Sequence, residues 1–173
     1  MDSINTLGLA AGIGALAGLR TFTPPAVASQ AARHSLIPLR RSRLHFLRSS
    51  GAANTLTALA IGELVADKLP SMPRRLEAGG LTMRAASGAV CGATIASARR
   101  SSKKIIAAGA VLGGLAAIAG GYVGYHVRRQ ICTKVNVPDP GVAGVEDVLA
   151  IGGSVAIVSR CASLLSIATR GRF

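Results

Sequence analysis

Six ionisable residues lie within or beside apolar stretches of the chain, where a charge must find a partner or reach water. They are Arg20, Glu63, Asp67, Arg84, Glu146 and Asp147. An arginine at membrane depth stays charged and costs roughly 3 kcal/mol to insert, whereas a carboxylate in a low dielectric attracts a proton or a cation. The six residues therefore form a candidate intramembrane polar site.

Two interpretations of this site remain open. In the first, it is a transport or conduction site, where arginine binds an anionic group and a carboxylate couples to protons or cations. In the second, the residues pair with one another and only fix how the helices pack. Water access to the region around Arg20 distinguishes the two, because a transport site must be hydrated at some stage.

Patterns that carry other chemistry do not occur in the sequence. The three histidines and three cysteines lack the spacing of metal or redox motifs, and there is no G-x-S-x-G motif or P-loop. The glycines at positions 12, 14 and 18 have the wrong spacing for a dinucleotide loop, and no strand precedes them. We therefore expect no enzyme, no catalytic residue, no metal and no cofactor.

The composition is that of a membrane protein. The 173 residues are 50% hydrophobic, with a mean hydropathy of +0.45. Twenty Lys and Arg stand against seven Asp and Glu, which gives a net charge of +13. These charges cluster between apolar segments rather than among aromatic residues, so they favour anionic lipid head groups as partners over nucleic acid.

We expect one integral membrane domain over residues 1–173, an all-α transmembrane helix bundle with about five spans. The spans cover residues 3–28, 51–69, 81–98, 105–127 and 142–165. Glycines four residues apart, such as Gly14 with Gly18, predict helices that pack to backbone contact and offer faces for a homo-oligomer. The pair Pro24-Pro25 predicts a break or kink in the first span.

The order of these features suggests an inverted repeat. A glycine-rich helix is followed by arginine, proline and a helix with a glycine–glutamate start, first over residues 7–67 and again over 105–160. With one span between them, the two pairs would have opposite membrane orientations, in a 2+1+2 arrangement that is common in transporters.

The connection over residues 33–50 is strongly basic. Its arginines Arg40, Arg41, Arg43 and Arg48 are finely mixed with apolar residues, a pattern typical of an interfacial segment that contacts anionic head groups; the alternative is a solvated loop. With five spans, this connection, residues 99–104 and the C-terminus share one side with eleven Lys and Arg, against six on the other. The positive-inside rule then places the N-terminus outside and the C-terminus in the cytoplasm.

Three stretches together resemble a known family. They are AGIGALAGLRTFTPP (11–25), GELVADKLPSMPRR (62–75) with MRAASGAVCGA (83–93), and GVEDVLAIGG (144–153). They resemble the bacterial membrane proteins grouped as domain of unknown function 4126 (DUF4126). The resemblance implies that its motif positions here are Arg20, Glu63, Asp67, Lys68, Pro70, Arg84 and Glu146. The long basic connection and Ala85, where proline is expected, depart from the family pattern.

The sequence thus favours a small transporter or channel of the bacterial inner membrane, for an ion or an anionic solute or lipid. The alternative is a non-transporting scaffold, or a lipid- or partner-binding protein with a basic cytoplasmic loop. In either case we expect Arg20 to pair with Glu63, because Gly14 and Gly18 would let that helix approach the Ala58/Gly62 face.

Overall fold

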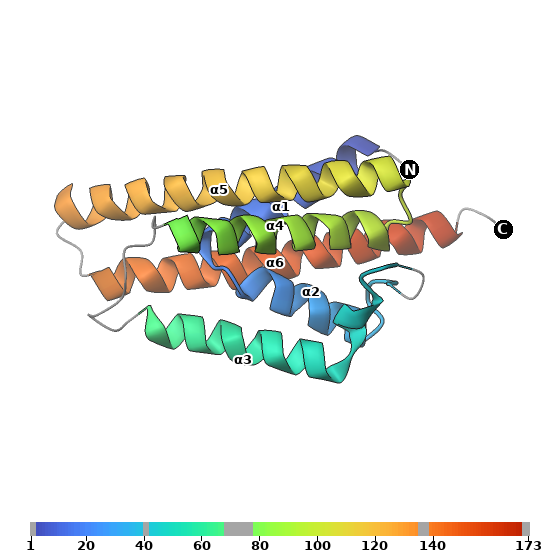
Figure 1. The fold of residues 1–173 in the computed structure, drawn as a ribbon, viewed down its shortest axis with the longest axis horizontal. Helices are drawn as coiled ribbons and strands as arrows, with labels where there is room; N and C mark the ends of the chain where they lie inside the picture. The colour runs from blue at the N-terminus through green and yellow to red at the C-terminus, as the bar shows by residue number, and fades with distance from the viewer. Residues whose placement is uncertain (1–2, 40–41, 68–77, 135–138, 171–173) are drawn as a thin grey trace.

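A computed structural model describes residues 3–39, 42–67, 78–134 and 139–170, and in these residues it is helical without strands. The elements are α1 (Ser3–Leu19), α2 (Thr23–Arg33), the short 3-10 helix η1 (His45–Arg48), α3 (Ser50–Ala66), α4 (Ala78–Ala98), α5 (Lys103–Lys134) and α6 (Asp139–Arg170). The helices lie side by side along one long axis (Figure 1). The expected all-α bundle is therefore confirmed.

The first apolar segment is broken, as expected, but the chain then reverses. α1 ends at Leu19 and α2 begins at Thr23, so Pro24 and Pro25 lie in the first turn of α2, where a missing N–H costs no helical hydrogen bond. The start of α1 lies at the end of α4, since Arg99 Nε donates to Thr6 Oγ1 at 2.7 Å. The end of α2 lies there too, because Ala32 shares a core with Ala98. Residues 3–28 are thus a helical hairpin and not one span.

This reversal adds one pass to the bundle. α3 to α6 each correspond to one of the other expected spans, and they alternate in direction along the long axis. Both ends of the described chain consequently lie at the same end of the bundle (Figure 1). The arrangement of five spans with the termini on opposite sides is not supported.

The inverted repeat is not supported either. Gly14 packs against Gly113 and Gly18 packs against Gly121, so α1 and α5 run in the same direction. The first helices of the two halves would have to run in opposite directions to form an inverted repeat. The similar order of glycine, arginine and proline in the two halves therefore does not correspond to a repeated structure.

Glycine packing brings α5 into backbone contact with both α1 and α4. A methyl group at Gly88 or Gly92 would overlap the backbone of α5 at Gly113 or Gly109, and one at Gly14 would also overlap Gly113. The predicted close approach of helices is thus confirmed for these glycines. The expected contact of α1 with Gly62 on α3 is wrong, because nothing lies within 4 Å of a Cβ placed there.

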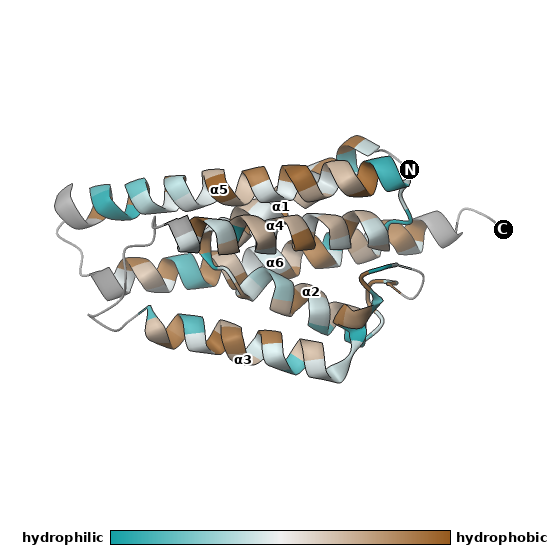
Figure 2. Ribbon diagram, in the orientation of Figure 1, coloured by the Kyte–Doolittle hydropathy of each residue, from teal (hydrophilic) through white to brown (hydrophobic). Residues whose placement is uncertain are grey.

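The distribution of buried and exposed residues differs from that of a soluble protein, because charged residues are buried and many large apolar side chains are exposed. The buried residues are mostly small, such as Ala10, Ala17 and Ala117, and they include the charged Arg20 and Glu146. Large apolar side chains point outward instead, among them Val111, Leu115 and Val123 on α5 and Val148, Leu149 and Val155 on α6. Figure 2 shows apolar residues over the middle of α5, with hydrophilic residues toward its two ends.

Candidate functional site

Arg20 occupies the centre of a buried group of charges at the α1–α2 break. Its guanidinium is 2% exposed, with Nη2 2.8 Å from Asp67 Oδ2 and 2.5 Å from Asp147 Oδ1. The same nitrogen lies 3.9 Å from Glu146 Oε2 and donates to the carbonyl oxygen of Ala143 at 3.4 Å. A single arginine therefore joins the end of α3 to the first turns of α6.

A second arginine bridges the same carboxylates. Arg128 on α5 places Nη1 3.2 Å from Asp67 Oδ2 and 3.3 Å from Glu146 Oε2. The side chains of Asp67, Arg128, Glu146 and Asp147 are each 9–13% exposed. We call these five residues, Arg20, Asp67, Arg128, Glu146 and Asp147, the charge cluster.

The local structure explains why each member reaches the cluster. Asp67 is the C-cap of α3, where the helix dipole disfavours a carboxylate and the two arginines compensate for it. Glu146 and Asp147 are adjacent on α6, so their side chains diverge by about 100° around the helix. This divergence lets Asp147 contact Arg20 while Glu146 contacts Arg128.

Glu63 does not pair with Arg20, so the expected partner is wrong. Its carboxylate instead accepts from the backbone N–H of Thr21 at 2.7 Å and from that of Phe22 at 2.8 Å. These donors precede α2 and have no partner within a helix, and a carboxylate at a helix N-terminus is favoured by the dipole. Ser87 Oγ of α4 donates to the carbonyl oxygen of Thr21 at 2.5 Å, so side chains from α3 and α4 fix the break.

Arg84 is buried next to the charge cluster. A Cβ placed on Gly121 of α5 would lie 3.5 Å from Cδ of Arg84. A Cβ placed on Gly124, one turn further along α5, would lie 3.8 Å from Oε1 of Glu146. Three arginines and three carboxylates, Arg84 and the charge cluster, thus balance in formal charge. A buried group of charges that balances in sign tolerates burial far better than an isolated charge does.

The structure therefore brings Arg20, Asp67, Glu146 and Asp147 together, sets Arg84 beside them and gives Glu63 a separate role at the helix break. The sequence does not point to Arg128 as a site residue, because Arg128 directly follows the apolar stretch 105–127. The helix α5 continues to Lys134, so Arg128 is still helical and its side chain contacts α3 and α6. Its position about one turn after Gly124, on the close-packed face, is the signal that indicates it.

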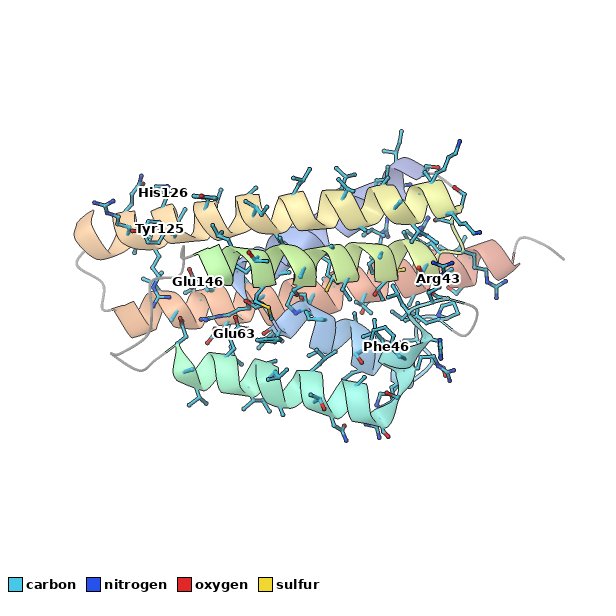
Figure 3. The ribbon with its side chains drawn as sticks, in the orientation of Figure 1. Arg43, Phe46, Glu63, Tyr125, His126 and Glu146 are labelled. Atoms are coloured by element: carbon cyan, nitrogen blue, oxygen red, sulfur yellow. The ribbon has the colours of Figure 1, made fainter. Side chains whose placement is uncertain are left out.

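The predicted basic site lies at the opposite end of the bundle from Glu63 and Glu146, as the labelled Arg43 and Glu146 show (Figure 3). Arg43 is exposed and Arg48 is half-buried. Arg40 and Arg41 lie outside the described residues. The connection folds back on the bundle, since Ser29 Oγ on α2 donates to the carbonyl oxygen of Leu47 at 2.5 Å and Leu47 is buried.

These features define a class of all-helical proteins with helices that could span a membrane; two described helices, Lys103–Ile131 and Gly141–Ile167, are long and apolar enough to cross one. The family model for the domain of unknown function DUF4126 matches residues 7–168, and the chain belongs to this family. No curated protein and no solved structure matches the chain.

Proposed function

We propose that this chain is an integral protein of the bacterial inner membrane, with its basic end in the cytoplasm, and that its charge cluster is a structural lock. The cluster holds the broken α1–α2 hairpin to α3, α5 and α6. The protein then acts as a non-transporting scaffold that presents its basic end to anionic lipids or to a partner. The burial of mutually paired charges inside an outer surface of large apolar side chains carries this proposal.

The outer surface supports the membrane part of the proposal. Only 28% and 22% of the apolar stretches in α5 and α6 are buried, whereas the core helix of a soluble protein would be mostly buried. Neither helix lies near the N-terminus, as a signal sequence would. An apolar surface of this length is unfavourable in water and favourable in lipid.

The burial of the cluster supports a lock rather than a pathway. Arg20 is 2% exposed and each cluster residue contacts an opposite charge within 3.3 Å. An anionic substrate that approached Nη2 of Arg20 would have to displace a carboxylate that this nitrogen already contacts. The structure has one cavity lined by Phe46 and its neighbours and another lined by Arg43 and its neighbours. No residue of the charge cluster lines either cavity.

A second candidate is the small transporter or channel, for an ion or an anionic solute or lipid. The helix break at the charge cluster favours it, since discontinuous helices mark the ion and substrate sites of many transporters. In that case the described conformation would be a closed state.

A homo-oligomer would have to use outward glycines such as Gly144 and Gly152, because those at 14, 88, 92, 109 and 113 pack inside the chain.

Carbonate extraction and flux measurements test the proposal together. The full chain should stay in the membrane pellet, and proteoliposomes should pass no protons, potassium or chloride above the level of empty vesicles. Asp147→Asn should lower the thermal stability in detergent, whereas Arg160→Gln on the exposed side of α6 should not. Ion flux in the wild type that Asp147→Asn abolishes would overturn the lock and establish the transporter.

A further inference from the structure

A large cavity opens at the basic end of the bundle, away from the charge cluster. Its volume is about 1220 Å³, and it lies between the connection after α2, the end of α4 and the start of α5. Four cations line it: Arg43 and Arg48 from the connection, and Arg100 and Lys103 from the turn between α4 and α5. Two segments that are more than fifty residues apart in sequence thus converge on one positively charged space.

These four cations are available to a ligand. Within the described part of the chain, none of their side chains has a hydrogen bond or an ion pair, in contrast to Arg33, which donates to Asn54, and Arg99, which donates to Thr6. The carboxylates whose contacts are described belong to the charge cluster and the helix break near the other end of the bundle. Clustered cations repel one another, so an anion in this cavity would relieve that repulsion.

The remaining wall of the cavity is apolar. Leu44, Ile106 and Ala107 contribute to it, and the next turn of α5 continues with Val111 and Leu112, which face outward. The cavity therefore leads from a cationic rim onto the apolar outer surface of α5. This shape fits a molecule with an anionic head and an apolar tail better than it fits a small anion alone.

We propose that this cavity binds one anionic phospholipid. Its phosphate lies between the cations of the two segments, and the start of its acyl chains follows α5 from Ile106 toward Val111. The inference deepens the proposed scaffold role and rests on the embedding of the bundle in a membrane. It is independent of whether the charge cluster is a lock.

Native mass spectrometry of the full chain in detergent tests the site with defined lipids. Phosphatidylglycerol should bind as a single tight adduct, and phosphatidylcholine with the same acyl chains should bind much more weakly. The double variant Arg100→Gln/Lys103→Gln should weaken the phosphatidylglycerol adduct about 30-fold. Each cation near the membrane surface contributes about 1 kcal/mol of binding free energy, and the loss of two such contributions corresponds to that fold-change. Ala107→Phe, which fills the apolar wall without changing charge, should also weaken it.

The matched control is Lys104→Gln/Arg160→Gln, which removes the same charge from exposed positions that do not line the cavity. It should leave the adduct within a factor of about three. An equal loss in both double variants would mean diffuse attraction and would overturn the site. Inorganic phosphate that competes fully at micromolar concentration, with no effect of Ala107→Phe, would show a free-anion site and overturn the lipid assignment.

The test separates this inference from the proposed function. A chain that stays in the carbonate pellet but shows no preference for phosphatidylglycerol refutes the lipid site alone. A chain that carbonate releases from the membrane refutes the embedding, and with it the lipid site. Thermal melting of each variant identifies those that fail to fold, and Ala107→Phe then serves as the second variant if the charge changes destabilise the chain.

Discussion

Arg20 shows how a single residue can determine the packing of several helices. It follows the last residue of α1, and its guanidinium contacts Asp67 at the end of α3 and Asp147 on α6. A buried ion pair adds little net stability over an apolar pair of the same shape, but removing one partner leaves a costly uncompensated charge. The charges therefore act mainly as selectors of one arrangement, because any packing that separates them is strongly penalised.

A double-mutant cycle tests this role of Arg20. Arg20→Met and Asp147→Asn should each destabilise the protein, by about 3–5 kcal/mol for the removal of Arg20. The double variant should be more stable than the sum of the two losses predicts, by more than about 1 kcal/mol. Melting can be followed with a thiol-reactive dye in a Cys132→Ser background, because Cys91 and Cys161 are free and buried.

The control cycle pairs Arg20→Met with Glu63→Gln. Glu63 binds backbone N–H groups beside Arg20 rather than its guanidinium, so its coupling to Arg20 should be clearly smaller than that of Asp147. A larger coupling to Glu63 than to Asp147 would contradict the described geometry.

The polar residues of the site could be predicted from the sequence, but their pairing could not. Charges in apolar stretches are expensive, so Arg20, Asp67, Glu146 and Asp147 had to meet partners somewhere. Which carboxylate meets Arg20 depends on where the chain turns, and the turn at Thr21–Phe22 leaves unpaired N–H groups that Glu63 satisfies. The Arg20 side chain and the backbone N–H groups of Thr21 and Phe22 could each pair with Glu63, and residue spacing does not show which of them does.

At the scale of helices, α5 packs closely against α1 and α4. Gly113 approaches Gly14 of α1 as well as Gly88 and Gly92 of α4. The four-residue glycine spacing predicted such contacts correctly, because only glycine lets two backbones approach this closely. It could not say which row meets which, since glycine rows carry no partner-specific chemistry.

Two glycine substitutions of opposite sign test this packing. Gly113→Ala should destabilise the bundle by about 1–3 kcal/mol, because the new methyl group would overlap the backbone of α4 at Gly88 and must push α4 away from α5. Gly62→Ala should stabilise it by about 0.5–1 kcal/mol, because the site is helical and open, and alanine has the higher helix propensity. Thermal melting in detergent measures both, and a loss at Gly62 as large as that at Gly113 would contradict the packing.

At the scale of the whole molecule, one short reversal changes the topology. The sequence indicates apolar segments and a break near the prolines, and each later segment is one helix of the bundle. It does not indicate that α2, with only 11 residues, returns to the side from which α1 came. Proline and glycine mark where a helix ends, but the direction of the next helix depends on packing, here in the core that Ala32 shares with Ile95 and Ala98.

The positions of the termini in a membrane follow from this reversal. The start of α1, the basic connection after α2 and the turn between α4 and α5 lie at one end of the bundle. The positive-inside rule places that end in the cytoplasm, because the charge bias of the connections does not depend on the number of passes. We therefore expect both termini on the cytoplasmic side, in contrast to the outside N-terminus that five spans require.

Reporter domains fused before Ser3 and after Phe173 should both report a cytoplasmic location, and a reporter inserted between α5 and α6 should report the opposite side. A periplasmic signal from the N-terminal fusion alone would mean that α2 does not return, and would restore the odd number of crossings.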